Sequence, residues 1–160
     1  MTQASDIRGA TFCTVKAGLT AGTTTTYTTT AAVGGSIGGK FVTALAAQTN
    51  TATPTTDGNG DDFTAVGANK GSVFVATLVA AGTIAVFQGT VEDCSDGGVF
   101  DIAPSFPAID LETYMPFGYV VIKVDSTGSD WTFGASNWTA TGVTDTFTDV
   151  TTLPLRPQTS

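Results

Sequence analysis

Residues 72–92 read SVFVATLVAAGTIAVFQGTVE and contain the longest apolar region of the chain. Two runs, 73–79 and 83–91, are rich in β-branched residues, and Ala-Ala-Gly at 80–82 separates them. β-Branched side chains fit a pleated strand, and glycine suits a tight turn. The pattern predicts a β-hairpin. Because both runs are apolar on both faces, we expect this hairpin in the centre of a sheet.

Three further strands are expected after the hairpin. Residues 119–124 read as a strand, residues 125–128 (DSTG) as a turn, and Trp131 and Phe133 point to one face of a return strand. Residues 143–150 alternate strictly, with Thr at each even position from 144 to 148. This period of two predicts a strand whose two faces differ.

Composition also disfavours helices. The 160 residues include 32 Thr and 19 Gly but only two Glu, and Thr and Gly are poor helix formers. We therefore expect an all-β fold, a single β-sandwich or small barrel-like domain with extended termini. A Thr/Gly-rich N-terminal arm with the first strands is expected over 1–40, the sandwich over 41–153, and an extended tail over 154–160.

The segment 101–117 carries three prolines, at 104, 107 and 116, which predict that it is not a central strand. It is nevertheless apolar, which indicates an ordered crossover lying on the sheet or a surface that meets a neighbouring chain. Together with residues of the N-terminal strands, it supplies the candidate contacts between chains. These are Thr11, Phe12, Tyr27, Phe106, Ile109, Leu111, Tyr114 and Met115.

The chain contains no His, so Ser–His and Cys–His nucleophilic pairs and HExxH zinc sites cannot be built from it. Its net charge of −8 opposes binding to a phosphate backbone. We expect a non-enzymatic protein with no catalytic residues, no cofactor, no metal site and no nucleic-acid partner. The sequence shows neither a secretory leader nor a membrane segment, so synthesis and retention in a cytoplasm are expected. Cys13 and Cys94 are expected as free, partly buried thiols rather than a disulfide.

Two loops resemble ligand-binding motifs. Residues 34–40 (GGSIGGK) match seven positions of a P-loop, but Phe41 stands where a magnesium-binding Ser or Thr is needed, which favours a Gly-rich turn between strands. Residues 57–61 (DGNGD) place oxygen ligands at alternate positions, as a calcium loop does. Asp62 and Ala68 stand where its glycine and bidentate Glu belong. An ordinary polar loop is the favoured interpretation.

Two side-chain groups have both a functional and a structural interpretation. Asp145 and Asp149 share one strand face. A pair of carboxylates can catalyse glycoside hydrolysis. We prefer the interpretation that these two charges keep the edge of the sheet from pairing with another strand. Trp131, Phe133 and Trp138 resemble an aromatic platform for sugars, and they also resemble a normal sandwich core, which we prefer.

Three stretches resemble a family of small virion structural proteins of tailed bacteriophages. They are 72–92, 103–124 (APSFPAIDLETYMPFGYVVIKV) and 131–157 (WTFGASNWTATGVTDTFTDVTTLPLRP), with a looser match over 40–58. Together they cover about the last three quarters of the chain and contain no catalytic signature. The resemblance implies a capsid decoration (cement) or head-fibre protein.

A decoration or head-fibre role also implies partners for the chain. The chain is expected to bind the major capsid protein and copies of itself, with a trimer expected by analogy with other decoration proteins. Its expected location is the capsid exterior of a virion assembled in the host cytoplasm. The alternative is a tail or fibre component that contacts the host surface through carbohydrate. Exposed Trp131 and Trp138 would favour the alternative.

Overall fold

The computed structural model describes residues 9–95 and 98–159. These residues form strands, turns and loops without a helix, and every strand pairing is antiparallel. The predicted all-β fold is therefore confirmed. The strands are β1 (Phe12–Cys13), β2 (Leu19–Ala21), β3 (Thr26–Thr29), β4 (Gly35–Ile37), β5 (Lys40–Phe41), β6 (Thr51–Ala52), β7 (Lys70–Val79), β8 (Ile84–Ser95), β9 (Val99–Phe100), β10 (Tyr114–Val124) and β11 (Val143–Asp149).

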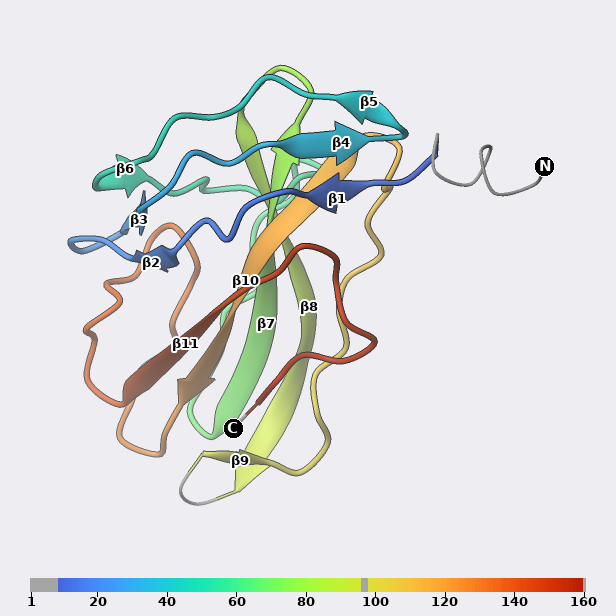
Figure 1. Ribbon diagram of the computed structural model, residues 1–160. Helices are drawn as coiled ribbons and strands as arrows, with labels where there is room; N and C mark the ends of the chain where they lie inside the picture. Colours follow the sequence, from blue (N-terminus) through green and yellow to red (C-terminus); the bar gives the residue numbers. More distant parts are fainter. Residues whose placement is uncertain (1–8, 96–97, 160) are drawn as a thin grey trace.

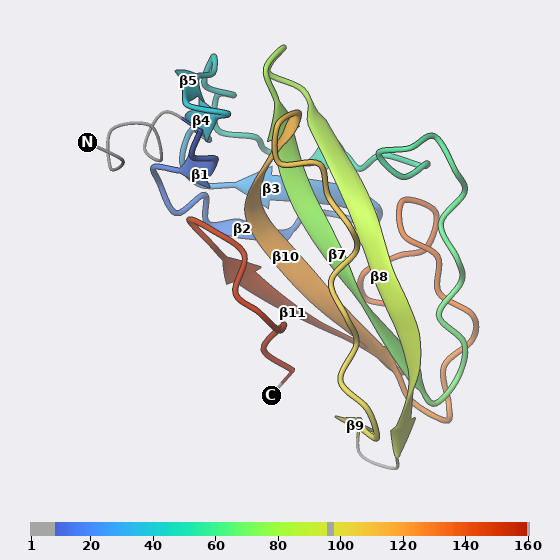
Figure 2. The same cartoon turned by 90° about the vertical axis from the view of Figure 1, so that its right-hand side faces the viewer.

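The strands form one large and two small sheets. The large sheet has the order β11-β10-β7-β8-β9, and the small sheets have the orders β1-β4-β5 and β2-β3-β6. The two small sheets form an N-terminal layer across one end of the long strands (Figure 1). The segment between β9 and β10 runs back along the long strands (Figure 2). We call residues 101–113 the crossover and residues 150–159 the C-terminal tail.

The predicted central hairpin is confirmed as β7 and β8. Gly82 has a φ of 81°, and its N–H donates to the carbonyl of Val79, so the turn needs the glycine. β7 pairs with β8 on one side and with β10 on the other. It is buried over nearly its whole length, because both faces of the sheet are covered.

The two faces of the large sheet pack against different parts of the chain. Phe74, Ala76 and Leu78 of β7 point to the N-terminal layer and to the loop between β10 and β11. Val73 and Val75 point to the opposite face, where the crossover and the tail cover them. The alternation places consecutive β7 residues in separate cores.

The predicted return strand at Trp131 and Phe133 is wrong. Trp131 makes a single bridge, to Val66, and lies in a long loop between β10 and β11. The strand that pairs with β10 is β11, from Val124↔Val143 to Gly118↔Asp149. The loop leaves the ladder because its aromatic side chains are buried in the core, and that burial outweighs a local hairpin.

Pro116 also departs from expectation, since it lies within β10, a central strand. The register between β10 and β7 shifts between Pro116 and Gly118, which marks a bulge. β11 pairs with β10 only from Gly118 onward. A proline without an N–H is tolerated where the ladder is interrupted in this way.

Candidate functional site

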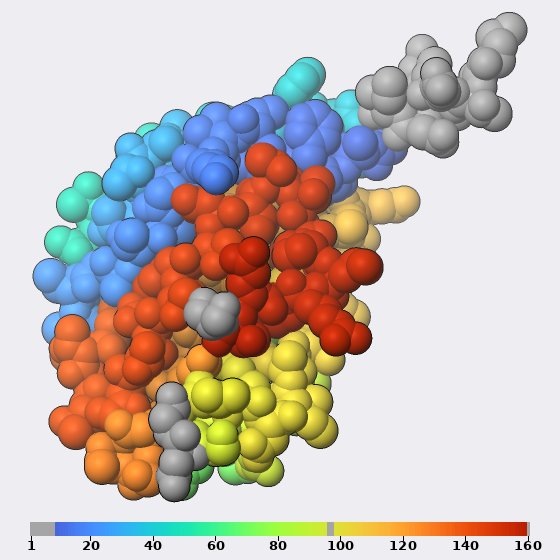
Figure 3. Space-filling view, turned by 60° about the horizontal axis from the view of Figure 1, so that its bottom comes forward, coloured from blue at the N-terminus to red at the C-terminus, as the bar shows by residue number. Residues whose placement is uncertain are grey.

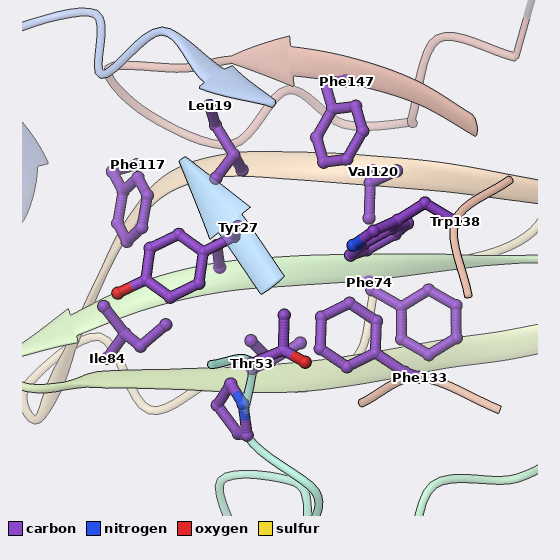
Figure 4. Close-up of a pocket in the computed structure, with 13 residues that line it drawn as sticks. Leu19, Tyr27, Thr53, Phe74, Ile84, Phe117, Val120, Phe133, Trp138 and Phe147 are labelled. Atoms are coloured by element: carbon purple, nitrogen blue, oxygen red, sulfur yellow. The ribbon is translucent and has the colours of Figure 1, made fainter. Parts of the chain in front are cut away.

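An apolar cavity lies between the large sheet and the N-terminal layer (Figure 4). Leu19, Tyr27, Phe74 and Phe117 point into it from four different strands. Its volume is only about 20 Å³, and a buried water needs polar partners that such walls do not offer. Trp138 also lines it. The cavity is a packing gap within the core rather than a substrate site.

The tryptophans do not form a surface platform. Trp131 is 1% exposed and Trp138 is 4% exposed. Their Nε1–H groups donate to the carbonyls of Asn137 at 3.0 Å and Thr26 at 2.7 Å, respectively. Phe133 packs against both rings. The interpretation of these residues as core is confirmed, and no sugar can stack on them in this fold.

The acidic loop at 57–61 uses its carboxylate to hold its own turn. Asp57 Oδ1 accepts from the backbone N–H groups of Asn59 at 2.8 Å and Asp61 at 3.0 Å, and Oδ2 accepts from Asn59 Nδ2. Among the residues that the structure describes, no group of three or more His, Cys, Asp or Glu side chains could hold a metal ion. The loop geometry is that of an Asx turn.

The P-loop-like stretch is a turn between two strands, as the favoured interpretation holds. β4 and β5 pair directly, with Ile37 opposite Lys40. Gly38 and Gly39 both have positive φ, 54° and 80°, which is the requirement of a two-residue hairpin turn. A phosphate-binding loop would instead lead into a helix. Phe41, directly after this turn, is 84% exposed.

Asp145 and Asp149 lie on the edge strand β11, but they differ in role. Asp149 accepts from two backbone N–H groups of the N-terminal layer, Gly18 to Oδ2 at 3.0 Å and Leu19 to Oδ1 at 3.1 Å. Asp145 has no such partner among the described residues. Asp149 therefore fastens β2 to β11. No sequence pattern signals this role, because the two partners of Asp149 lie far away in the chain.

Cys13 and Cys94 are both buried free thiols, as expected. Cys13 lies in β1, and Cys94 lies in the part of β8 that pairs with β9. β1 and β9 are at opposite ends of the molecule (Figure 1). Burial raises the pKa of each thiol. A raised pKa keeps the unreactive thiol form at neutral pH.

Two of the eight residues predicted at contacts between chains are enclosed by the chain itself. Tyr27 is 5% exposed and lines the cavity, and Met115 is 0% exposed. Neither side chain can reach a neighbouring chain, because both are buried between the large sheet and the N-terminal layer.

Three more of the eight pack partly on the sheet. The ring of Phe106 meets that of Tyr119 edge to face, with centroids 5.2 Å apart. Tyr114 meets Phe87 in the same way at 4.8 Å. Ile109 packs on the same outer face as Phe106. The crossover is thus ordered on the sheet, which is one of the two roles expected for it.

The remaining three lie near the first strand. Thr11 Oγ1 donates to the carbonyl of Leu111 at 2.5 Å and accepts from the N–H of Gly38 at 2.9 Å. Phe12 is half-buried in β1. Leu111 is 48% exposed, whereas the other seven residues are buried or half-buried. Thr11 joins the end of the crossover to the β4–β5 turn.

A groove lies between the crossover and the C-terminal tail, lined by residues 102–106 and 155–157, with a volume of about 370 Å³. We call it the tail groove. The tail lies on the surface between the N-terminal strands and the part of the chain near residue 100 (Figure 3). Ile102 and Leu155, on the two walls of the groove, are 69% and fully exposed, respectively. Sequence reasoning missed this groove, because its two walls are about 50 residues apart.

The described residues include no helix that could cross a membrane. No protein-family model, curated protein or solved structure matches the chain.

Proposed function

We propose that this chain is a non-enzymatic virion protein of a tailed phage that binds the outer surface of the capsid and stabilises the shell. The proposal starts from the resemblance of residues 72–92, 103–124 and 131–157 to small phage virion proteins. Its partner would be the major capsid protein.

One observation supports the proposal beyond the resemblance. The polar and aromatic residues considered as candidates for catalysis or ligand binding make contacts within their own chain, whereas several large apolar side chains are exposed. Asp57 and Asp149 bind backbone N–H groups of their own chain, and both tryptophans are buried. The exposed set lies on turns, short strands and irregular segments: Val15, Phe41, Val99, Ile102, Leu111 and Leu155. Exposed apolar side chains of this kind can become the buried centre of a contact with another protein.

The β4–β5 turn is the part of this surface that we assign to the capsid. Phe41 is 84% exposed and follows the turn whose Gly39 N–H donates to the carbonyl of Ala10. The turn is therefore held against the segment that leads into β1. An exposed apolar side chain on such a turn can enter a gap between capsid subunits, and binding to the assembled lattice alone would stabilise that lattice by mass action.

The test is co-sedimentation of the full chain with expanded empty capsids of the phage that carries the gene, with isolated tails as the comparison. We expect saturable binding to capsids and a higher capsid melting temperature. Binding to tails alone, or to neither particle, would overturn the proposal. Tail binding would favour the alternative of a tail or fibre component. Such a component would have to bind its target without the expected sugar platform, because both tryptophans are buried.

Two variants locate the contact. Phe41→Asp should weaken capsid binding by about tenfold or more, because a charge would be buried in an apolar contact. Val99→Asp is the matched control, since Val99 is 64% exposed on β9, at the opposite end of the molecule (Figure 1). Capsid binding that survives Phe41→Asp would move the contact to another face.

A further inference from the structure

The tail groove is a preformed feature whose walls are anchored on both sides. On the crossover wall, Ser105 and Thr90 bond reciprocally: the Ser105 N–H donates to Thr90 Oγ1 at 2.9 Å, and the Thr90 N–H donates to the Ser105 carbonyl at 3.3 Å. On the tail wall, Gln158 donates its N–H to the hydroxyl of Tyr119 at 2.9 Å, and Pro157 is buried. Rigid walls lower the entropic cost of binding.

Two apolar side chains of the groove, Ile102 and Leu155, are exposed to solvent. Leu155 lies between Leu153, which packs on the outer core, and the buried Pro157. Arg156 is the one charged residue that lines the groove, and among the described residues it makes no hydrogen bond or ion pair. The groove therefore offers an apolar contact beside an unpaired cation, in a chain whose net charge is −8.

The same chain carries a turn of complementary character at the other end of the crossover. Leu111 is 48% exposed and stands between two exposed carboxylates, Asp110 and Glu112. Asp110 Oδ1 accepts from the Glu112 N–H at 3.0 Å, and Oδ2 accepts from Thr113 Oγ1 at 2.7 Å. These bonds hold the turn together. They also lower the pKa of Asp110, so its carboxyl is negatively charged at neutral pH. Glu112 has no side-chain partner among the described residues.

We infer that two copies of this chain associate through these features, with the turn 110–112 of one copy seated in the tail groove of the next. Leu111 would meet Ile102 and Leu155, and the carboxylate of Glu112 would meet Arg156. The groove and the turn carry opposite charges, and in each of them an exposed apolar side chain lies beside the charge. Such complementarity fixes the register of two proteins at an interface.

The contact joins two different patches, so it is heterologous. A heterologous contact closes into a ring when its rotation allows and otherwise extends into a filament. The self-association does not depend on capsid binding, and it gives the chain a means of covering a surface with linked copies.

Sedimentation velocity of the full chain, from about 1 μM to about 1 mM, tests the inference. We expect concentration-dependent association of the wild type. Arg156→Glu and Glu112→Arg should each weaken it by about tenfold or more, because each places like charges together. The double variant R156E/E112R keeps the wild-type net charge and should restore association. Because these residues do not pair within one chain, rescue reports a contact between copies.

Lys16→Glu is the matched control, since it makes the same charge change at an exposed lysine outside the groove and should leave association unchanged. A wild type that stays monomeric over the whole range, a double variant that fails to associate, or a Lys16→Glu variant as weak as Arg156→Glu would each overturn the inference. Near-UV circular dichroism of every variant confirms that the fold is intact. A monomeric chain that still binds capsids would leave the proposed function standing.

Discussion

At the scale of single residues, one carboxylate of the edge strand holds the two layers together. Asp149 accepts from Gly18 and Leu19 of the N-terminal layer, whereas Asp145, four residues earlier on the same face, makes no comparable bond among the described residues. Both are half-buried. Comparing variants of these two residues therefore separates two contributions to stability: the hydrogen bonds that Asp149 accepts from the N-terminal layer, and the negative charge that both residues place on the edge strand.

Asp149→Ala should lower the free energy of unfolding by about 2 kcal/mol, because two backbone N–H groups lose a charged acceptor. Asp145→Ala should change it by no more than about 0.5 kcal/mol, as most substitutions without such a role do. Urea unfolding followed by tryptophan fluorescence measures both. Equal losses in the two variants would show that general edge charge, rather than the hydrogen bonds of Asp149, stabilises the fold.

Residue roles were predictable from the sequence where they depend on local chemistry. The glycines at 38, 39 and 82 mark turns, and large aromatics dominate cores. The role of Asp149 was not predictable, because its acceptor function depends on partners about 130 residues away. The tail groove escaped prediction for the same reason.

At the scale of elements, the sequence predicts strand pairs that are joined by a short turn. The hairpin of β7 and β8 is of this kind, and so is the β4–β5 turn. β11 was predicted as a strand from its alternation, but its pairing with β10 was not, because an 18-residue loop (125–142) that contains both tryptophans lies between them. That these buried rings belong to a loop, rather than to a return strand beside β10, is a tertiary effect that no local pattern reports.

The C-terminal tail is an element without regular secondary structure, and two bonds fix its end. Gln158 donates to the hydroxyl of Tyr119 at 2.9 Å, and Lys123 Nζ donates to the carbonyl of Thr159 at 2.6 Å. Tyr119 is fully buried beneath the tail. Since the tail forms one wall of the tail groove, its anchoring bears directly on that surface.

Tyr119→Phe should release the end of the tail while the sheet stays folded. We expect amide exchange at Gln158 to accelerate by about tenfold and the free energy of unfolding to fall by about 1 kcal/mol, which are the effects of one lost hydrogen bond. Tyr27→Phe is the control, since Tyr27 is equally a core residue but its hydroxyl makes no hydrogen bond among the described residues. Unchanged exchange at Gln158 would contradict this anchoring.

At the scale of the whole molecule, the fold is a sheet with both faces covered by other segments of the chain. Its N-terminal side is covered by β1 to β6, and its outer side by the crossover and the tail. Composition and alternation were enough to predict an all-β fold of the sandwich or small barrel-like kind. They could not show that the first forty residues supply much of the second layer, because a Thr-rich sequence without clear alternation does not reveal which face is buried.

Deleting residues 1–40 tests whether this region is an arm or a structural layer. The deletion removes six of the ten buried residues of the first core cluster, namely Cys13, Ala17, Leu19, Tyr27, Val33 and Ile37. Leu78, Met115 and Phe117, all 0% exposed, would then face water. Each fully buried apolar side chain contributes about 1.5–3 kcal/mol, and a whole domain is stable by only about 5–15 kcal/mol.

We therefore expect the deletion variant to lose its cooperative unfolding transition and its near-UV circular dichroism. Deletion of residues 154–160 is the control: it removes the anchored end of the tail but keeps Val150 and Leu153 on the outer core, so that variant should fold with reduced stability. A cooperative transition in the variant that lacks residues 1–40 would mean that the long sheet folds without its N-terminal layer. The region would then be an appendage available for attachment, and Asp149 would fasten that appendage to the sheet rather than join two halves of one core.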